Sequence, residues 1–476
     1  MAESKRITRD SLTYVVGEVL SKSMAFILLP IYINYLSHDE VGILLLVTTI
    51  WPVVAVFLGQ SFTAYLMRGY FGQQEKERFA GTVILFTVFW GGLAAVIIHL
   101  TAPYTFGMIY KKVDYKPYLQ YSVIFAFFRL YLIQVLTVFR AKRQPQKSVF
   151  LSFVLLLFNL ASVLIAIFYL HGNVVTILRA QTIAYMVSAI VFTITVWPAL
   201  SFNLMPRVIK PGLYFILPLI PHTLSGLLLT NTGRALVERH LTLAELSLFG
   251  VAAQLSLIPG VIANGLNQAW TPFLYENIHQ PGFKNIFANI ARKNLLLVLI
   301  IGAIVSIFTY DLLFLIGKEK YLQAANLVPV LTFTYFMQML YFTYVPVLIY
   351  YKKTGLMPLI SIISGAFALI MNMLLVPQYG MMGAAISTVS AFAVMAMLAY
   401  YYSRRHFKCP IISGRLIVFI ALLLLMIIIN ATIVRQFEWS LQLVSKFVFV
   451  GLMIYLLPRL GLLNFKDLVS FIRMKV

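Results

Sequence analysis

Long apolar blocks separated by short polar stretches run through the whole chain. Most of the blocks hold twenty or more residues, and glycine, proline or clustered charges mark their ends. A helix rises about 1.5 Å per residue, so about 20 apolar residues cross a hydrocarbon core of about 30 Å. Cutting the sequence at these ends predicts fourteen membrane-spanning helices: 12–35, 41–66, 80–101, 117–139, 149–170, 174–198, 212–233, 243–270, 294–316, 325–350, 355–376, 380–402, 414–434 and 441–458.

Composition excludes a set of soluble domains for these 476 residues. Hydrophobic residues make up 61% and charged residues 11%, whereas a soluble domain is about half apolar and about a quarter charged. We therefore expect an all-α polytopic membrane protein. The longest stretch between spans, 271–293, is too short for a globular domain, so function must reside in the helices. The single cysteine, Cys409, excludes an intramolecular disulfide and a cysteine metal cluster.

The formal net charge of +22 is distributed unevenly between the two sides of the predicted helices. With a cytoplasmic N-terminus, 25 Lys and Arg fall on the cytoplasmic side and 8 on the other. The eight are Lys111, Lys112, Lys116, Arg234, Arg239, Lys318, Lys320 and Arg435. Cytoplasmic loops of membrane proteins collect Lys and Arg, so this asymmetry predicts that both termini are cytoplasmic. It also explains the basic charge without nucleic acid, which we exclude as a partner.

A weak internal repeat suggests two halves. The strings FILLPIYI at 26–33 and FILPLIPH at 215–222 both open with Phe-Ile-Leu and contain proline. We expect an N-terminal six-helix bundle over 1–200, a C-terminal six-helix bundle over 201–405, and two extra helices with a cytoplasmic tail over 406–476. Prolines within several spans either reflect the higher frequency of proline in membrane helices or predict broken helices, which in transporters mark the substrate path. Their presence in the first helix of each half favours the second interpretation. These prolines are Pro30, Pro52, Pro218, Pro221, Pro259, Pro272, Pro329 and Pro346.

Ionisable residues inside membrane spans are candidate functional groups, because a charge in lipid costs about 2.5–3.5 kcal/mol on insertion scales. Glu18 and Lys22 lie four residues apart, on one face of the first span. They either neutralise each other or face a cavity. In the second case Lys22 would contact an anionic substrate, and Glu18 would carry a coupling proton or set the charge of the lysine.

Two arginines within spans have no acid three or four residues away. Arg129 lies deep in its span, and its planar guanidinium matches phosphate oxygens, which makes it the best candidate for binding a phosphate-bearing ligand. Arg179 lies near the outer end of its span, where snorkelling to the interface is the favoured interpretation.

The seventh and eighth spans hold further candidates. Arg234, with Glu238 four residues later, is either a cavity gate or an interfacial salt bridge. His222 follows Pro221 and either packs in the core or lines a hydrated cavity. Several amides lie in these spans, where they are either interhelical hydrogen-bond partners or sugar ligands. Among them, Asn267 is the candidate for binding the substrate. The set is Asn231, Gln254, Asn264, Asn267 and Gln268.

Enzyme signatures are scarce. Only Glu18 among the acids lies deep in a span, so no buried carboxylate pair is available for acid–base chemistry. The sequence has no HExxH, GxSxG, Walker or Rossmann pattern in a suitable context. We expect a protein that is not an enzyme and that needs no cofactor or metal.

Several strings resemble one family of membrane proteins. LLPIYINYLSHDEVGILLL at 28–46 is similar to the opening of Wzx-type flippases of lipid-linked polysaccharide and oligosaccharide units. Later strings resemble the second half of the same family, from about residue 215 to 402. They are FILPLIP at 215–221, AWTPFLYE at 269–276, IGKEKYLQAANLVPVL at 316–331 and MNMLLVPQYGMMGAAISTVSAF at 371–392.

The resemblance implies membership of the multidrug, oligosaccharidyl-lipid and polysaccharide exporter superfamily. Its implied fold is that of multidrug and toxin extrusion (MATE) carriers, with two six-helix bundles around a central cavity. Its implied role is to move a polyprenyl-pyrophosphate-linked oligosaccharide across the bacterial inner membrane, for O-antigen, capsule or exopolysaccharide. Many relatives end the seventh helix with Asp-Arg, but here the dipeptide is Gly233-Arg234, so an ion-coupling role of that aspartate does not transfer.

Two rival functions remain open. An ion-coupled extruder of cationic drugs would need acids in the cavity, which the spans almost lack. A membrane glycan polymerase or acyltransferase would need a large outer loop with clustered catalytic residues, but the longest predicted outer loop is 102–116. For a flippase, H+ or Na+ is a candidate coupling ion and a glycan polymerase is a candidate partner. The sequence does not decide the coupling ion.

Overall fold

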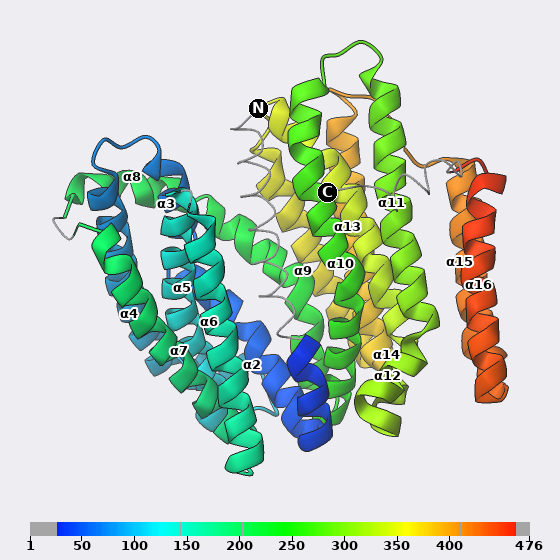
Figure 1. Ribbon diagram of the computed structural model, residues 1–476, viewed down its shortest axis with the longest axis horizontal. Coiled ribbons are helices and arrows are strands. Elements are labelled where there is room, and N and C mark those ends of the chain that lie inside the picture. The colour runs from blue at the N-terminus through cyan, green and yellow to red at the C-terminus, as the bar shows by residue number, and fades with distance from the viewer. Residues whose placement is uncertain (1–25, 143, 202–203, 410, 463–476) are drawn as a thin grey trace. The chain divides into compact units, whose positions relative to one another are not determined.

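The computed structural model describes residues 26–462, except residues 143, 202–203 and 410. Every regular element in this part of the chain is a helix (Figure 1). Eleven of these helices are long and apolar enough to cross a membrane, and one bent pair, Pro206–Ile216 with Leu219–His240, makes twelve. The chain is therefore an all-α polytopic membrane protein, as its apolar blocks predict.

The expected count of fourteen spans is compatible with these helices. Helix α14 (Leu356–Ser403) covers two expected spans, and its backbone is non-helical at Gly380, with φ 57° and ψ −139°. Two helices thus meet within α14. The apolar helix Phe26–Tyr35 is the described end of the first expected span, and the rest of that span lies outside the described residues.

The chain divides into two compact units, Met1–Gly250 and Val251–Val476. In the first unit α5 packs against five other helices, α2, α3, α4, α6 and α7, and α9 packs against α2. The expected division at residue 200 stays a prediction. The helices of the first unit are α2 (His38–Phe57), α3 (Phe62–Tyr70), α4 (Lys76–Ile109), α5 (Gln120–Ala141), α6 (Pro145–Leu164), α7 (Val174–Val196), α8 (Ile209–Ile216) and α9 (Leu219–His240).

Helix α10 (Leu243–Asn277) begins in the first unit and ends in the second. In the second unit α13 packs against α11 and α14, and α15 packs against α11 and α16. The two additional helices expected at the C-terminus are α15 and α16. The remaining bounds are α11 (Phe283–Ile307), α12 (Thr309–Gly317), α13 (Val328–Tyr350), α15 (Gly414–Thr432) and α16 (Trp439–Arg459).

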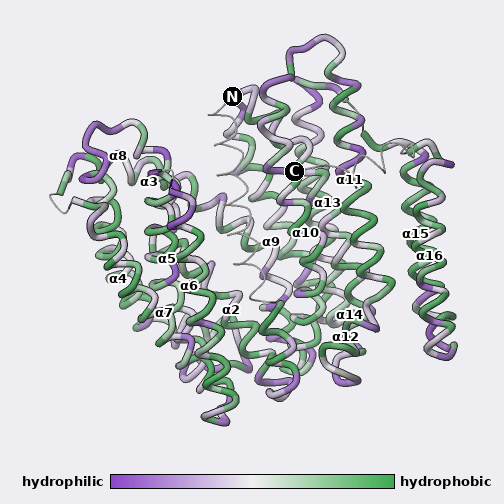
Figure 2. Tube along the Cα trace, in the orientation of Figure 1, coloured by the Kyte–Doolittle hydropathy of each residue, from purple (hydrophilic) through white to green (hydrophobic). Residues whose placement is uncertain are grey.

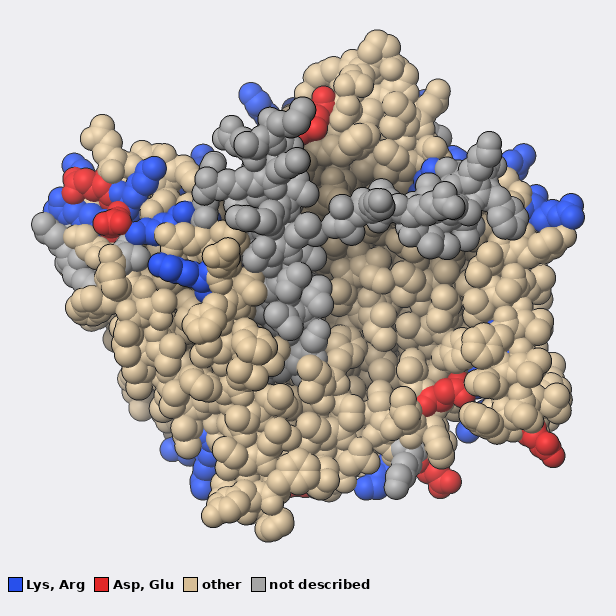
Figure 3. Space-filling model, in the orientation of Figure 1, with Lys and Arg blue, Asp and Glu red and all other residues tan. Residues whose placement is uncertain are grey.

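Apolar side chains cover the long helices on the outside as well as the inside. Figure 2 shows hydrophobic residues along the helices and hydrophilic residues gathered near their ends. On the face shown in Figure 3, most Lys and Arg lie near the helix ends. Such a surface suits a hydrocarbon environment. On α4, for example, a run of large apolar side chains is exposed: Phe89, Trp90, Leu93, Val96, Ile97 and Leu100.

Prolines break fewer helices than the sequence predicts. Helix α2 continues through Pro52, α10 through Pro259 and Pro272, and α13 through Pro346. Pro218 lies where two helices, α8 and α9, meet at an angle of 46°. A proline removes a single backbone hydrogen bond, and neighbouring groups in a membrane bundle can compensate for it.

Candidate functional site

A break between α2 and α3 interrupts what the sequence predicts as one span. Gly59 has φ 102°, a conformation that glycine adopts easily because it has no Cβ. The Gln60 N–H donates to the Ala55 carbonyl at 2.9 Å, and the Trp90 indole N–H donates to the Phe57 carbonyl at 3.2 Å. These bonds satisfy backbone groups that a broken helix would otherwise leave unpaired in the membrane. The break is therefore stabilised by specific contacts.

A cavity of about 460 Å³, which we call the first-unit cavity, lies beside this break. Its walls are the break with α3, the C-terminal half of α5 and the first turns of α9. Its volume falls within the range of about 300–1,000 Å³ that is typical of small-molecule sites. The lining residues are Gln60, Ser61, Thr63, Ala64, Met67, Ile133, Thr137, Arg140, Leu219 and Thr223.

The polar groups of the first-unit cavity are not all used within the protein. The buried atoms Gln60 Oε1 and Thr63 Oγ1 have no hydrogen-bond partner in the described part of the chain. Arg140 is exposed, and no other described residue forms an ion pair or hydrogen bond with it. Ile133, Thr137 and Arg140 follow one another at helical spacing on one face of α5. The cavity thus offers one free guanidinium and unpaired oxygen atoms, and its lining contains no carboxylate.

Arg129 lies elsewhere on α5, about three turns before Arg140. Its Nη1 donates to the Tyr185 hydroxyl at 2.8 Å, and its guanidinium carbon lies 4.3 Å from the Trp51 ring centroid. No described carboxylate pairs with it, and it does not line the first-unit cavity. Aromatic groups of α2 and α7 therefore hold this half-buried cation, and its role in binding phosphate stays a prediction.

Arg179 lies in the second turn of α7 and has an exposed side chain. Its Nε donates to the Tyr121 hydroxyl at 3.3 Å. Arg179 does not line the first-unit cavity either.

The remaining predicted residues are dispersed. His222 lies in the first turn of α9 beside the lining residue Thr223, and its buried Nδ1 has no hydrogen-bond partner among the described residues. Arg234 is half-buried further along α9. Asn267 belongs to the second unit, where its backbone carbonyl accepts from the Thr271 hydroxyl at 2.9 Å. Glu18 and Lys22 lie outside the described residues.

Sequence reasoning missed the residues that line the first-unit cavity. The span 117–139 predicts Arg140 in a cytoplasmic loop, but α5 extends to Ala141. Gln60 and Thr63 lie in an apolar stretch and carry no charge, so the charge pattern does not indicate them as site residues. The signal available was the pair Gly59-Gln60 within a predicted span, where a flexible residue precedes an amide.

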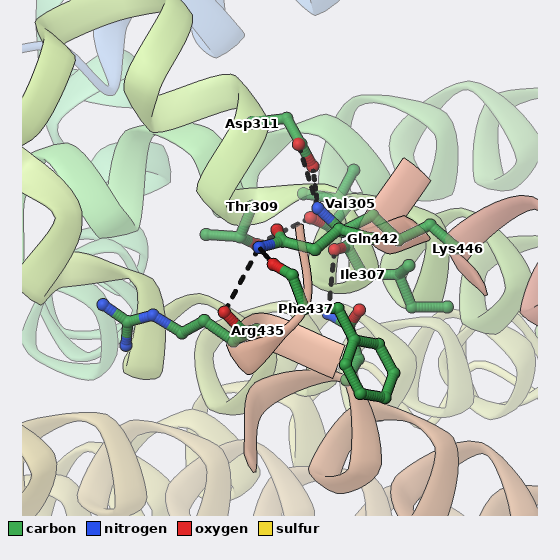
Figure 4. Close-up of polar contacts among 9 residues, drawn as sticks. Val305, Ile307, Thr309, Asp311, Arg435, Phe437, Gln442 and Lys446 are labelled. Carbon is green, nitrogen blue, oxygen red and sulfur yellow. Dashed lines mark hydrogen bonds and ion pairs between the residues drawn. The ribbon is translucent and has the colours of Figure 1, made fainter. Parts of the chain in front are cut away.

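A buried ion pair in the second unit was also not foreseen. Lys446 of α16 is 2% exposed, and its Nζ donates to both carboxylate oxygens of Asp311 on α12, at 2.9 and 2.7 Å (Figure 4). Nearby, the Asn430 amide donates to the Ile307 carbonyl at 3.0 Å. These contacts fix α15 and α16 to the junction of α11 and α12. No group of three or more His, Cys, Asp or Glu in the described part of the chain is placed to hold a metal.

Comparison with known proteins places the chain in a family. The profile of the family described as "Polysaccharide biosynthesis protein" matches residues 7–278, more than half of the chain. The chain belongs to this family. An uncharacterized membrane protein of Haemophilus influenzae is 23% identical over 328 residues, which cover 66% of this chain and 76% of that protein.

Solved structures show the same fold. The lipid II flippase MurJ in an inward closed conformation has a TM-score of 0.73 at 12% identity and covers 95% of this chain and 99% of its own. The inward-facing conformation of a multidrug resistance MATE family transporter of the MOP superfamily has a TM-score of 0.62 at 14% identity. This similarity covers 81% of this chain and 94% of the transporter chain. The expected MATE-like fold is therefore confirmed, while Wzx-type specificity stays a prediction.

Proposed function

We propose that this protein is a flippase for a polyprenyl-pyrophosphate-linked oligosaccharide in the bacterial inner membrane. It would work by alternating access and serve the assembly of O-antigen, capsule or exopolysaccharide. Membership of the polysaccharide biosynthesis family and a fold shared with a lipid II flippase support this function.

The observation that carries the proposal is the charge and polarity of the first-unit cavity. Pyrophosphate and sugar groups cannot cross hydrocarbon unaided, so a carrier must surround them with cations and hydrogen-bonding groups while the lipid tail stays in the bilayer. Arg140 is suited to a phosphate, because its guanidinium presents a fork of N–H donors and is not neutralised by a described acid. Gln60 Oε1 and Thr63 Oγ1 are suited to accept hydrogen bonds from sugar hydroxyls.

The charge asymmetry of the loops supports the direction of transport. Arg140 lies at the end of α5 that the positive-inside rule places in the cytoplasm. A substrate made in the cytoplasm would therefore meet the cavity at its cationic end. In this orientation both termini are cytoplasmic.

The rival in the same fold, an extruder of cationic drugs, receives less support. A cation site in the membrane requires a carboxylate or a set of carbonyl groups to compensate for desolvation. The ten residues that line the first-unit cavity include no acid and one arginine, which would repel a cationic drug.

Deletion of the gene in the source bacterium, with analysis of surface glycan and lipid-linked intermediates, tests the proposal. We expect surface polymer to disappear and the lipid-linked oligosaccharide to accumulate on the cytoplasmic side, because synthesis continues while transfer stops. A plasmid copy of the gene should reverse both effects. Normal surface polymer without trapped intermediate, in a strain that has no second carrier of this family, would refute the assignment.

A further inference from the structure

The far end of α9 carries a carboxylate that is held in an unusual way. Glu238 is fully buried, and its oxygens accept hydrogen bonds from three successive backbone N–H groups in the loop after α4. The Lys111 N–H lies 2.9 and 3.0 Å from the two oxygens, and the Val113 N–H lies 3.0 Å from Oε1. Lys112 supplies the third N–H. Successive N–H groups form a concave anion site, and bonds to an ionised carboxylate are stronger than neutral ones.

Two side chains add hydrogen bonds to the same contact, one from α9 and one from the loop after α4. Arg239 Nη1 donates to the Met108 carbonyl at 2.7 Å, and Lys112 Nζ donates to the Leu241 carbonyl. The end of α9 and the loop after α4 are therefore joined by bonds given from both sides. We call this set of contacts the Glu238 latch.

A close helix contact lies at the same end of the first unit. A Cβ atom at Gly42 of α2 would lie 2.5 Å from the Leu243 carbonyl oxygen at the start of α10. A Cβ atom at Gly250 would lie 2.6 Å from Leu45 Cδ1. At Gly42 the neighbouring atom belongs to the backbone, so this approach requires glycine, whereas at Gly250 the Leu45 side chain can shift. The start of α10 therefore fits tightly against α2 at Gly42.

The opposite ends of α2 and α9 are arranged differently. There the break after α2 and the first turns of α9 are two walls of the first-unit cavity, and α9 meets α8 at an angle of 46°. Helix α9 is thus joined to the loop after α4 at the latch end, whereas its first turns and the break after α2 line a cavity at the other end. The positive-inside rule places the latch end outside and the cavity end in the cytoplasm.

We propose that the Glu238 latch is the outer gate of the transport cycle, closed in this structure and released when the substrate leaves toward the outside. The inference rests on the proposed function, because a gate has a role only if the protein carries a substrate. Glu238 is a positioning residue here and does not touch substrate. Release is feasible because water outside the membrane can replace the bonds of both the carboxylate and the N–H groups.

Crosslinking across the latch tests this proposal. Lys112→Cys and Arg239→Cys place thiols on two exposed residues of opposite sides of the latch, in a Cys409→Ala background that removes the single native cysteine. Cells are treated with a membrane-impermeant, reducible thiol crosslinker, and surface polymer is measured before and after reduction. We expect crosslinking to stop export and reduction to restore it. Export at the uncrosslinked rate, with the crosslink formed, would show that transport does not require the latch to open and would overturn the proposal.

A matched pair controls for the reagent. Tyr35→Cys with Phe168→Cys joins two exposed rings whose centroids lie 4.8 Å apart, at helix ends on the same predicted side. Both belong to the first six predicted helices, so this crosslink should leave export unchanged. If the control pair also stops export, the block at the latch is a general effect of the crosslinker, and the gate is refuted.

A second measurement does not depend on export. Val237→Cys places a thiol at a buried position beside Glu238, and its labelling from outside by an impermeant maleimide reports opening. Glu238→Gln should raise the labelling rate about tenfold, since it weakens charge-assisted bonds to the N–H groups. Gly42→Ala should also raise it, because the added Cβ prevents close contact with α10. Unchanged labelling in both variants would refute the gate.

The two measurements separate the gate from the proposed function. If labelling of Val237→Cys shows that the latch opens, while the unmodified protein moves no lipid-linked oligosaccharide, the gate is supported and the substrate assignment fails. The opposite result is that the unmodified protein exports normally, while the crosslink leaves export unchanged and the substitutions leave the labelling rate unchanged. In that case the substrate assignment stands and the gate fails.

Discussion

Lys446 in the second unit and Arg140 in the first unit are cations of the membrane bundle with opposite surroundings. Lys446 is almost fully buried, and both oxygens of Asp311 accept from its ammonium group. Arg140 is exposed to the first-unit cavity, where no described acid pairs with it. The buried pair has little capacity left for a ligand, whereas the guanidinium of Arg140 gives none of its donors to another described residue. Charge within a membrane bundle therefore indicates a binding site only when the bundle does not itself neutralise it.

The largest effect should follow from removing one partner of the buried pair. Lys446→Ala leaves the Asp311 carboxylate without its cation beside the membrane, and we expect the free energy of unfolding to fall by about 3 kcal/mol. Thermal unfolding in detergent measures this loss. The double variant Lys446→Met with Asp311→Leu should regain most of it, since no charge remains unpaired. Equal stability of the single variant and the unmodified protein would show that the pair is not structural.

Removal of the unpaired cation should affect transport instead of stability. Arg140→Ala should lower export about tenfold at equal protein level, which is the loss expected for one charge-assisted hydrogen bond. Arg140→Lys should retain part of the export, because it keeps the positive charge. Surface polymer per membrane protein is the measurement. Lys147→Ala is the matched control, because Lys147 is an exposed cation near the same end of the first unit and does not line the cavity. Equal loss in both variants would remove the cavity from the mechanism.

Arg129 is an intermediate case, because aromatic groups hold it and no acid of the described residues pairs with it. Arg129→Ala should impair export about threefold through loss of the cation–π contact with Trp51 and of the bond to Tyr185. Arg179→Ala, at an exposed position, should impair it less. Export rates at equal expression compare the two. Normal export in both variants would remove Arg129 from the mechanism.

The smallest effect should come from an exposed pair. Arg78 Nη1 lies 2.8 Å from Glu75 Oε2, and this hydrogen bond, with the charge of Arg78 and Arg207 nearby, lowers the pKa of Glu75 below its ordinary value. A lowered pKa stabilises the fold above the ordinary pKa of the group, and the gain is lost as pH falls through the lowered value. Glu75→Gln should therefore change the melting temperature slightly at neutral pH and not in strong acid. High salt should abolish the difference, and a difference that survives high salt would contradict this electrostatic origin.

Much of the fold follows from the sequence because each membrane helix can be predicted from one continuous apolar segment. Apolar blocks long enough to span the bilayer predict α4 and α5, and the resemblance to flippases predicts the MATE-like fold. The break at Gly59 escaped prediction because glycine also occurs in unbroken membrane helices. The candidate site was harder to predict because the first-unit cavity is lined by segments that lie far apart in the chain, represented by Gln60, Arg140 and Thr223.

Contacts between distant segments also explain why the sequence indicates Arg129 and not Arg140. The sequence indicates Arg129 because it lies deep in an apolar span without a local acid, but the rings of Trp51 and Tyr185 that contact it come from other helices. Arg140 follows the predicted span 117–139 directly, where the sequence indicates a cytoplasmic loop. Only the packing of α3 and α9 beside α5 places it at a cavity.

Transbilayer movement of a defined substrate tests the central claim most directly. The purified protein is reconstituted into liposomes that carry a labelled polyprenyl-pyrophosphate oligosaccharide in the inner leaflet, and an impermeant glycosidase outside reports arrival in the outer leaflet. We predict release of label well above the rate in protein-free liposomes, with a marked decrease for Arg140→Ala. Release at the protein-free rate, from folded protein present in either orientation, would contradict the account.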